Sequence, residues 1–319
     1  MNPVGSGPHG VLVVDKPEGP TSHDIVARAR RLLSTRRVGH TGTLDPMATG
    51  VLVLCVGSAT RLARFLAAAE KTYVGRLRLG WETDTLDRTG RPLSQPQPTP
   101  ENPALVDLAI QSLVGRRLQH PPAFSAKRID GVRSYRMARQ GAPRIPAPSY
   151  VVIRAFRLLA MEGTEIQFEV SCSSGTYVRA LAQELGQALG CGAHLTALRR
   201  TMAGEFGLDQ ARTLVELQEL AASGRAADAL LPNSMLLLGM PGVEVDATAA
   251  RLLSQGGTLE VQDRFRSTLT GDTWCRILGA DGTLLGLAQV EAGGGRLHPR
   301  IVLVSPPPEA GVAASCPPR

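Results

Sequence analysis

The densest group of polar residues in the sequence lies in the segment GHTGTLDPMATG, residues 39–50. This segment has neither a helical nor a strand period and contains three glycines and a proline, so we expect a loop between two buried elements. Pro46 holds the backbone of Asp45 out of the helical region, and glycines let a loop pass close to a ligand. Asp45 is therefore a candidate for a group that contacts a ligand or does chemistry. The alternative is an ordinary Asp-Pro turn that ends a strand.

The elements around this loop can be predicted from hydrophobic periodicity. An apolar run at 11–14 indicates a buried strand, and Thr21 with Asp24 fits the capping box of a helix that reaches Leu33. After the loop, residues 51–56 indicate a second buried strand and residues 58–69 a second helix. Residues 72–80 alternate as a half-buried strand does, with Tyr73 on the apolar side.

The following segments continue the mixture of strands and helices. Residues 92–103 contain five prolines and are expected to form an exposed connector, and residues 104–114 indicate a helix. Apolar segments at 151–153 and 166–172 indicate two more strands. We therefore expect an α/β or α+β domain with a mixed sheet flanked by helices.

The chain of 319 residues is long enough for two domains, and its pattern changes near Leu238. Beyond that residue, short strands and Gly-rich turns predict a small, mostly β domain over residues 239–304. The Asp281-Gly282 dipeptide between two apolar runs is a strong hairpin signal. We expect a first domain at 1–238 and a disordered, Pro-rich tail at 305–319.

Charge is the unusual feature of the composition. The formal net charge is +7, and the basic residues are three lysines and 32 arginines. A GC-rich coding bias could explain this ratio, but the planar arginine fork is also well suited to phosphate and to stacking on bases. The composition is 43% hydrophobic and 20% charged, which excludes a wholly disordered chain, a collagen and a coiled coil.

The five cysteines are scattered and form no C-x-x-C pair, so we expect neither a disulfide framework nor a zinc site. No apolar run suits a signal peptide or a membrane span. We therefore expect a cytoplasmic protein with no membrane partner. Nothing in the sequence requires an oligomer, and a monomer is expected.

In the order of its motifs, the chain resembles the bacterial tRNA pseudouridine-55 synthase (TruB) family. The loop at 39–50 is similar to the catalytic loop of that family. Other stretches that resemble family motifs lie at 15–22, 71–87, 120–141, 173–179 and 192–200. The resemblance covers about residues 10–205, and an ordered series of this kind is far more specific than any one motif.

The resemblance implies a pseudouridine-synthase fold with an RNA-gripping insertion at about 119–148 and a PUA-like RNA-binding domain at 239–304. It implies that a uridine in the T-loop of tRNA, at position 55, is flipped out and isomerised. The N-glycosidic bond breaks, the base rotates, and the base is rejoined through C5. No cofactor and no metal are implied, and the partner is the T-arm of tRNA.

Three catalytic residues follow from the resemblance. Asp45 matches the catalytic aspartate, which acts as nucleophile or as base at the ribose, and this choice stays open. Arg179 matches the arginine that binds and aims this carboxylate. Tyr73 matches the aromatic residue that stacks on the displaced base, and its phenol is a candidate for removing the C5 proton. Without the resemblance, Tyr73 would be a core tyrosine of a strand.

Five further residues are implied to bind substrate. Tyr177 and Leu198 match residues of the uracil pocket, His40 matches a residue that helps to flip the nucleotide, and Asp87 matches an acidic residue of unassigned role. Lys16, in the first motif, is counted with them. The alternatives are a strand-end aromatic for Tyr177, a helix core leucine for Leu198, and a surface or capping histidine for His40.

Base flipping must be repaid by contacts to phosphate, so basic residues are expected beside the loop. About half of the following candidates are expected to contact RNA: Arg36, Arg37, Arg61, Arg64, Lys127, Arg128, Arg133, Arg136, Arg139, Arg199 and Arg200.

Two other functions are possible. An RNA-binding protein without turnover would not need Asp45, Tyr73 and Arg179 in one pocket. A guide-RNA-dependent synthase would lack the insertion between residues 119 and 142. The sequence therefore favours the stand-alone isomerase.

Overall fold

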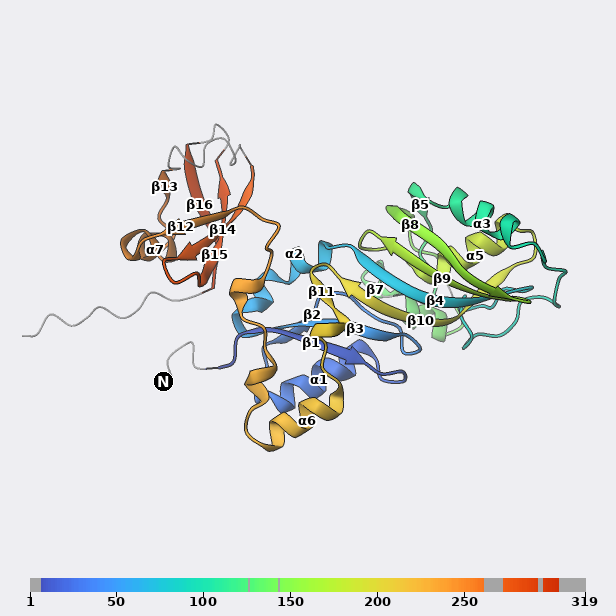
Figure 1. The fold of residues 1–319 in the computed structure, drawn as a ribbon, viewed down its shortest axis with the longest axis horizontal. Coiled ribbons are helices and arrows are strands. Elements are labelled where there is room, and N and C mark those ends of the chain that lie inside the picture. The colour runs from blue at the N-terminus through green and yellow to red at the C-terminus, as the bar shows by residue number, and fades with distance from the viewer. Residues whose placement is uncertain (1–6, 126, 143, 261–271, 292–294, 304–319) are drawn as a thin grey trace, which may run out of the picture. The chain divides into compact units, whose positions relative to one another are not determined.

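The computed structural model describes residues 7–125, 127–142, 144–260, 272–291 and 295–303, without the side chains of Arg128, Arg133 and Arg139. The chain divides into two compact units (Figure 1). One unit contains residues 12–55 and 63–230, and the other contains residues 1–11, 56–62 and 231–319. The expected tail at 305–319 lies outside the described residues.

A nine-stranded sheet forms the framework of the larger unit (Figure 1). The order of its main path is β1 (Gly10–Lys16), β3 (Thr49–Val56), β10 (Ala193–Ala203), β4 (Lys71–Leu79), β9 (Glu165–Cys172), β8 (Ser149–Glu162) and β5 (Gly115–Gln119). The short strands β2 (Val38–His40) and β11 (Phe206–Gly207) pair with β3 and β10. Because β10 runs parallel to β3 and antiparallel to β4, the sheet is mixed, as predicted.

The helix predicted after Thr21 is confirmed as α1 (Ser22–Leu32), with the expected capping box between Thr21 and Asp24. The predicted helix at 58–69 is wrong as one element, because a 3₁₀ turn, η1 (Gly57–Leu62), precedes the short helix α2 (Ala63–Ala68). The hydroxyl of Thr60 donates to the Gly57 carbonyl at 2.7 Å. This local bond competes with α-helical pairing of that carbonyl.

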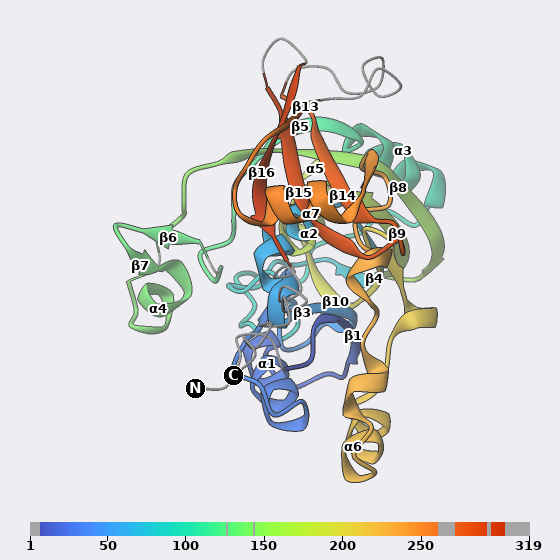
Figure 2. The same cartoon turned by 90° about the vertical axis from the view of Figure 1, so that its left-hand side faces the viewer.

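Other helices flank the sheet. Helix α3 (Pro103–Ser112), which matches the prediction at 104–114, packs on β8, and α5 (Val178–Ala188) packs on β10. Helix α6 (Leu214–Ala222) contacts α1. Between β5 and β8, the insertion folds into a two-stranded sheet of β6 (Arg128–Ile129) and β7 (Val132–Arg133), followed by α4 (Ser134–Arg139) (Figure 2).

The alternation predicted for residues 72–80 is confirmed in β4, which buries Tyr73, Leu77 and Leu79. Strand β8 is much longer than the apolar run at 151–153 that predicted it. The C-terminal half of this strand, residues 157–162, is largely exposed, and its pairing with β9 continues to Glu162. Backbone pairing, not side-chain burial, therefore sustains the end of this hairpin.

The smaller unit contains a five-stranded sheet in the order β12 (Gly242–Val245), β14 (Trp274–Gly279), β15 (Leu284–Val290), β16 (Arg296–Val302) and β13 (Leu259–Glu260). The predicted hairpin at Asp281-Gly282 is confirmed, since β14 and β15 pair antiparallel and Gly282 has φ +77°. Helix α7 (Ala247–Ser254) packs on this sheet. The described part of the unit is the small, mostly β fold that the sequence predicted.

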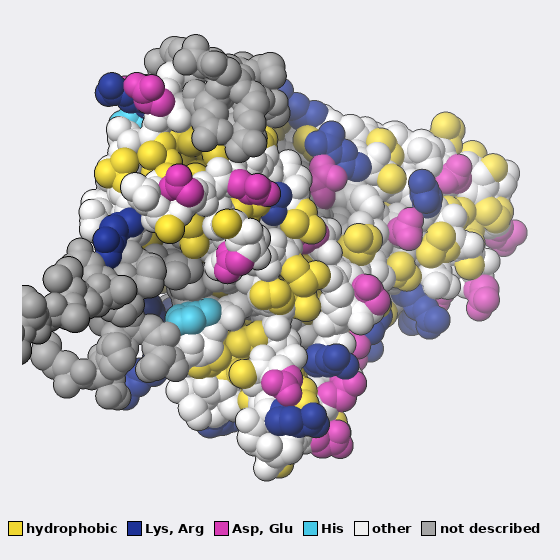
Figure 3. All heavy atoms as spheres, turned by 60° about the vertical axis from the view of Figure 1, so that its left-hand side comes forward, with side chains coloured by type: hydrophobic (Ala, Val, Ile, Leu, Met, Phe, Trp, Pro, Cys, Tyr) yellow, Lys and Arg dark blue, Asp and Glu magenta, His cyan; other side chains and the backbone are white. Residues whose placement is uncertain are grey.

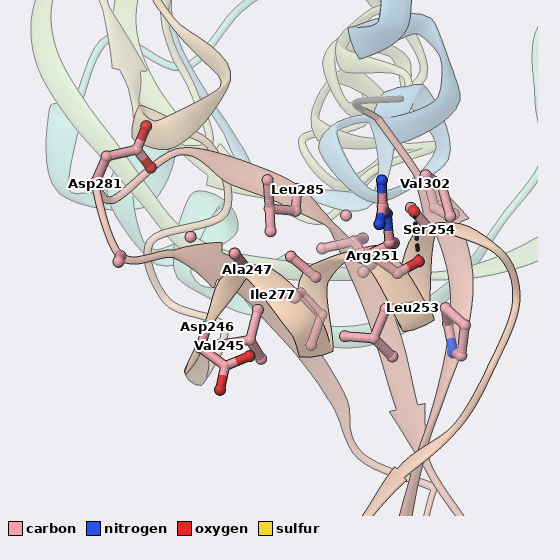
Figure 4. Close-up of a pocket in the computed structure, with 17 residues that line it drawn as sticks. Val245, Asp246, Ala247, Arg251, Leu253, Ser254, Ile277, Asp281, Leu285 and Val302 are labelled. Carbon is pink, nitrogen blue, oxygen red and sulfur yellow. Dashed lines mark hydrogen bonds between the residues drawn. The ribbon is translucent and has the colours of Figure 1, made fainter. Parts of the chain in front are cut away.

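A pocket of about 370 Å³ opens beside α7 in this unit (Figure 4). Its walls are mainly apolar and include Val245, Leu253, Ile277 and Leu285. Four polar residues also line it: Asp246, Arg251, Ser254 and Asp281.

The described cysteines Cys55, Cys172, Cys191 and Cys275 are buried free thiols, and Cys316 lies outside the described residues. Over the part of the chain that the structure describes, no helix has the length and apolar character needed to cross a membrane.

Candidate active site

The loop that carries Asp45 runs from the end of β2 to the start of β3. Residues in the segment after β1 form hydrogen bonds to the residue before Asp45 and to the residue after it. On one side, the Ser22 hydroxyl accepts from Leu44 N at 2.8 Å and donates to Leu44 O at 3.0 Å. On the other, Gly19 N donates to Pro46 O at 2.9 Å. Since both neighbours of Asp45 are bonded to the chain, its backbone position is well defined.

Lys16 reinforces this arrangement from the end of β1. Its side chain is fully buried, and Nζ donates to the carbonyls of Ala48 at 2.7 Å, Pro17 at 3.0 Å and Pro46 at 3.3 Å. Burial lowers its pKa to about 8, although the charge of Asp45 acts in the opposite direction. The family motif had suggested that Lys16 binds substrate, but its three donors are all used by backbone carbonyls.

We expect Lys16→Met to change how the free energy of unfolding depends on pH. Between about pH 8 and the ordinary lysine pKa of 10.5, the unfolded chain holds a proton that the native protein has released. This group therefore makes the parent protein more stable as pH rises through that range. The variant lacks this contribution, so the free energy of unfolding of the parent relative to that of the variant should increase by at most about 1.4 kcal/mol per pH unit. Urea unfolding from pH 7 to pH 10 measures it, and parallel curves for the two proteins would contradict the assignment.

Arg179, in the first turn of α5, binds Asp45 with two hydrogen bonds. Nε donates to Oδ2 at 2.8 Å and Nη2 donates to Oδ1 at 3.2 Å. The arginine side chain is 5% exposed, whereas that of Asp45 is 36% exposed. The carboxylate is thus aimed by a buried fork on one side and accessible to a ligand on the other.

The Arg179 guanidinium is itself fixed by three further groups. Nη1 donates to Thr85 O and Nη2 to Phe124 O, both at 2.8 Å. Asp87, which is buried, brings a second carboxylate to 3.7 Å from Nε. Asp87 is held in turn by Thr85 Oγ1 at 2.8 Å and Thr89 N at 2.9 Å. The Asp87 carboxylate, for which the sequence suggested no partner, therefore forms an ion pair with the arginine.

Tyr73 of β4 lies directly opposite Arg200 of β10. Burial raises the pKa of the Tyr73 phenol, and the Arg200 guanidinium beside it opposes this rise. Arg200 is itself buried, with Nε donating to Val51 O at 2.6 Å and Nη2 to Gly42 O at 3.1 Å. Arg200 is therefore not among the candidates that can contact RNA phosphate here, because its guanidinium is inside the protein and bonds the loop to the sheet.

The remaining predicted residues lie on neighbouring elements. Tyr177 is half-buried at the N-cap of α5, where burial raises the pKa of its phenol. Leu198 is buried on β10, two residues before Arg200, and so is not a helix residue. His40 is half-buried at the end of β2, where the loop begins.

The structure thus brings Asp45, Arg179 and Asp87 into direct contact. Tyr73 and Tyr177 lie near enough to Asp45 for its charge to raise the pKa of each phenol. The sequence analysis did not identify Ser22 as a residue that holds the loop, although the capping box beside it marked this segment. It also gave no role to Gln119, because only the tertiary contact between its side chain and Tyr177 at the start of α5 indicates one.

The described residues contain no cluster of three or more His, Cys, Asp or Glu side chains placed to hold a metal ion. The arrangement instead provides one oriented, accessible carboxylate beside buried aromatic and aliphatic side chains. Such a site suits nucleophilic or base catalysis on a ligand with a planar ring.

Comparisons with known proteins agree with this geometry. Residues 30–178 match the model of the TruB family pseudouridylate synthase (N terminal domain), and residues 179–237 match that of the tRNA pseudouridylate synthase B C-terminal domain. A tRNA pseudouridine synthase B of Solibacter usitatus is 48% identical over 247 residues, which are 77% of this chain and 84% of that protein. One of Aromatoleum aromaticum is 42% identical over 291 residues, which are 91% of each chain.

Among solved structures, the fold resembles a chain in the crystal structure of a Cbf5-Nop10-Gar1 complex. The TM-score is 0.73 at 24% identity, over 95% of this chain and 88% of that chain.

Proposed function

The chain belongs to the TruB family of pseudouridylate synthases, and we propose that it isomerises uridine 55 in the T-loop of tRNA to pseudouridine. The tRNA substrate is proposed from the names of the relatives. The observation that carries the proposal is the Asp45 carboxylate, which Arg179 holds bidentately while one side stays accessible.

In the proposed reaction, the target nucleotide leaves the stack of the T-loop and enters the site. Asp45 acts at the ribose, as nucleophile or as base, while the bond between N1 and C1′ breaks. The base turns, C5 bonds to C1′, and the proton lost from C5 is replaced by one on N1. Both routes need an ionised carboxylate, which the guanidinium of Arg179 binds with two hydrogen bonds.

Tyr73 is proposed to stack on the uracil and to accept the proton from C5. Its raised pKa keeps the phenol neutral before the reaction, and the Arg200 guanidinium lowers the cost of charging it. Tyr177 and Leu198 are proposed to line the base pocket, and His40 to occupy the space that the flipped nucleotide leaves.

The wider assignment follows the sequence analysis. We propose that residues 1–238 form the catalytic domain with an RNA-gripping insertion at about 119–148, and that residues 239–304 form a PUA-like RNA-binding domain. Since one chain supplies all the residues of the proposed site, no second copy is needed and the proposed enzyme is a monomer. Because the proposed substrate is tRNA, we also propose a cytoplasmic location.

The test is to incubate an unmodified tRNA transcript with the protein, without guide RNA, and to map pseudouridine. We expect the product at position 55 only, and none in a transcript with cytidine there. The same test on an isolated T-arm hairpin should give product, because the proposed contacts lie in the T-arm. Tight binding of tRNA without product would favour an RNA-binding protein instead.

We expect tRNA affinity to fall with salt, by about 0.7 to 0.9 log units per log unit of salt for each phosphate contact. Of the candidate arginines, Arg36 and Arg37 are exposed beside β2. The double variant Arg36→Gln/Arg37→Gln should reduce the slope by about 1.5 if both contact phosphate.

Arg154→Gln/Arg157→Gln is the matched control for the loss of two charges, because these arginines already pair with Glu70 and Glu169. The control is needed because basic and acidic side chains are interspersed on the face drawn in Figure 3, so that net charge alone does not locate a phosphate contact. Equal slopes for the two double variants would show that Arg36 and Arg37 do not contact RNA.

A further inference from the structure

Gln119 is the last residue of β5, where the strand meets the insertion, and its side chain is 1% exposed. Its amide makes two hydrogen bonds to the backbone of one residue. Oε1 accepts from Tyr177 N at 2.8 Å, and Nε2 donates to Tyr177 O at 3.3 Å. Tyr177 is the N-cap of α5, but no side-chain capping bond is made there by Tyr177 itself. The Gln119 amide thus supplies a fixed attachment for the start of this helix.

The position of Arg179 depends on this start, because Arg179 lies in the first turn of α5, two residues after Tyr177. Its two bonds to Asp45 need both the distance and the direction of the fork to be correct. A small displacement of the first turn would therefore move the guanidinium and turn the carboxylate. Catalytic rates respond strongly to such displacements.

The segment that begins at Gln119 also contacts Arg179 directly, because Arg179 Nη2 donates to Phe124 O. The next carbonyl back, Ala123 O, accepts from the buried Ser134 hydroxyl at 2.6 Å, and that hydroxyl also contacts Arg144 O at 3.0 Å. Residues at both ends of the insertion are thereby connected to the arginine that holds Asp45.

We propose that Gln119 is a positioning residue of the reaction, which fixes the first turn of α5 and so couples the insertion to the Arg179–Asp45 pair. This inference rests on the proposed function, since the orientation of Asp45 matters for turnover only if Asp45 is catalytic. Gln119 acts through Tyr177 and Arg179 and does not itself contact the uridine.

The test compares Gln119→Met with the parent protein. Methionine has a similar length but cannot make either bond to Tyr177. Under single-turnover conditions with saturating enzyme, we expect the rate constant to fall about 10- to 100-fold. The Kd for tRNA should change less than about threefold, since no phosphate contact is removed. Gln218→Met, on the exposed side of α6, is the matched control and should keep the parent rate.

A second readout does not depend on activity. The chain has four tyrosines, so labelling with ¹⁵N-tyrosine resolves few amide signals, and hydrogen exchange of the Tyr177 amide can be followed. Exchange should be faster in Gln119→Met than in the parent, because the amide loses its acceptor. If the parent forms no pseudouridine, the proposed function fails, and this exchange rate alone decides whether Gln119 holds Tyr177.

Gln119→Glu gives a test by pH in a variant of nearly the same shape. A protonated carboxyl can accept from Tyr177 N and donate to Tyr177 O as the amide does, whereas a carboxylate cannot donate. The groups facing this position are Glu184, whose pKa burial raises and which also hydrogen-bonds the Gln119 side chain, with Arg117 and His120 near it. Repulsion between two carboxylates adds to the loss at high pH and is relieved by the same protonation. The rate of this variant relative to the parent should therefore rise as pH falls from 8 to 6.

Three results would overturn the proposal: a parent-like rate in Gln119→Met, unchanged exchange at Tyr177, or an equal loss in Gln218→Met. A ratio of variant to parent rate that does not change with pH in Gln119→Glu would also count against it.

Discussion

Asp45→Asn should abolish pseudouridine formation while leaving the fold and the affinity for tRNA unchanged. Asparagine has the same shape, so the loop held by Ser22 and Lys16 should persist. Its amide is neither a nucleophile nor a base, and it presents only one oxygen to Arg179. Because both proposed routes begin with the ionised carboxylate, we expect the single-turnover rate to fall on the order of 10³-fold or more.

The measurement is pseudouridine formed in a tRNA transcript at saturating enzyme, together with the Kd for the same transcript. Asp228→Asn, at an exposed carboxylate outside the site, is the matched control and should keep the parent rate. Product formed by Asp45→Asn at a rate near that of the parent would remove Asp45 from the mechanism. Lost binding together with lost product would instead show that the loop had changed shape.

Arg179→Lys should produce the second large loss, although it preserves the positive charge. The guanidinium makes two bonds to Asp45 and one each to Thr85 O and Phe124 O. An ammonium is a point donor that cannot hold a carboxylate bidentately or reach all of these acceptors at once. The carboxylate keeps a cation beside it but is no longer held in a fixed orientation, so we expect the rate to fall about 10²- to 10³-fold with tRNA affinity nearly unchanged.

The control is Arg212→Lys, at an exposed arginine 3.9 Å from Glu216 on the neighbouring turn, where either cation can serve. Retention of most of the parent rate by Arg179→Lys would mean that charge alone suffices at this position. A large drop in melting temperature for Arg179→Lys would point to stability, so thermal unfolding is measured beside the rate.

Short-range chemistry accounts for the parts of the fold that could be predicted. The cap at Thr21 and the turn at Asp281-Gly282 depend on residues only two or three positions apart. The alternation of β4 likewise shows directly in the order of its side chains. The helix at 58–69 and the length of β8 were mispredicted because a hydroxyl bond within one turn and pairing with β9 decided them.

For the site, the family motifs identified Asp45, Arg179 and Tyr73 by type, but not what each of them contacts. Arg199 and Arg200 are adjacent in a basic pair and looked equivalent. In the fold, Arg199 is partly exposed and pairs with Asp15, whereas Arg200 is buried against carbonyls. Successive residues of a strand point to opposite faces, so the sheet gives these neighbours different surroundings.

The sequence by itself determined the chemical groups available, the local elements and the family to which the chain belongs. Only the tertiary structure decided which groups meet, because Asp45 and Arg179 are 134 residues apart and Gln119 and Tyr177 are 58 apart. Such contacts depend on strand order and on the packing of α5 against β10, and no local pattern encodes them. Burial makes these polar contacts important for stability, because a polar group removed from water costs free energy unless it is hydrogen-bonded within the protein.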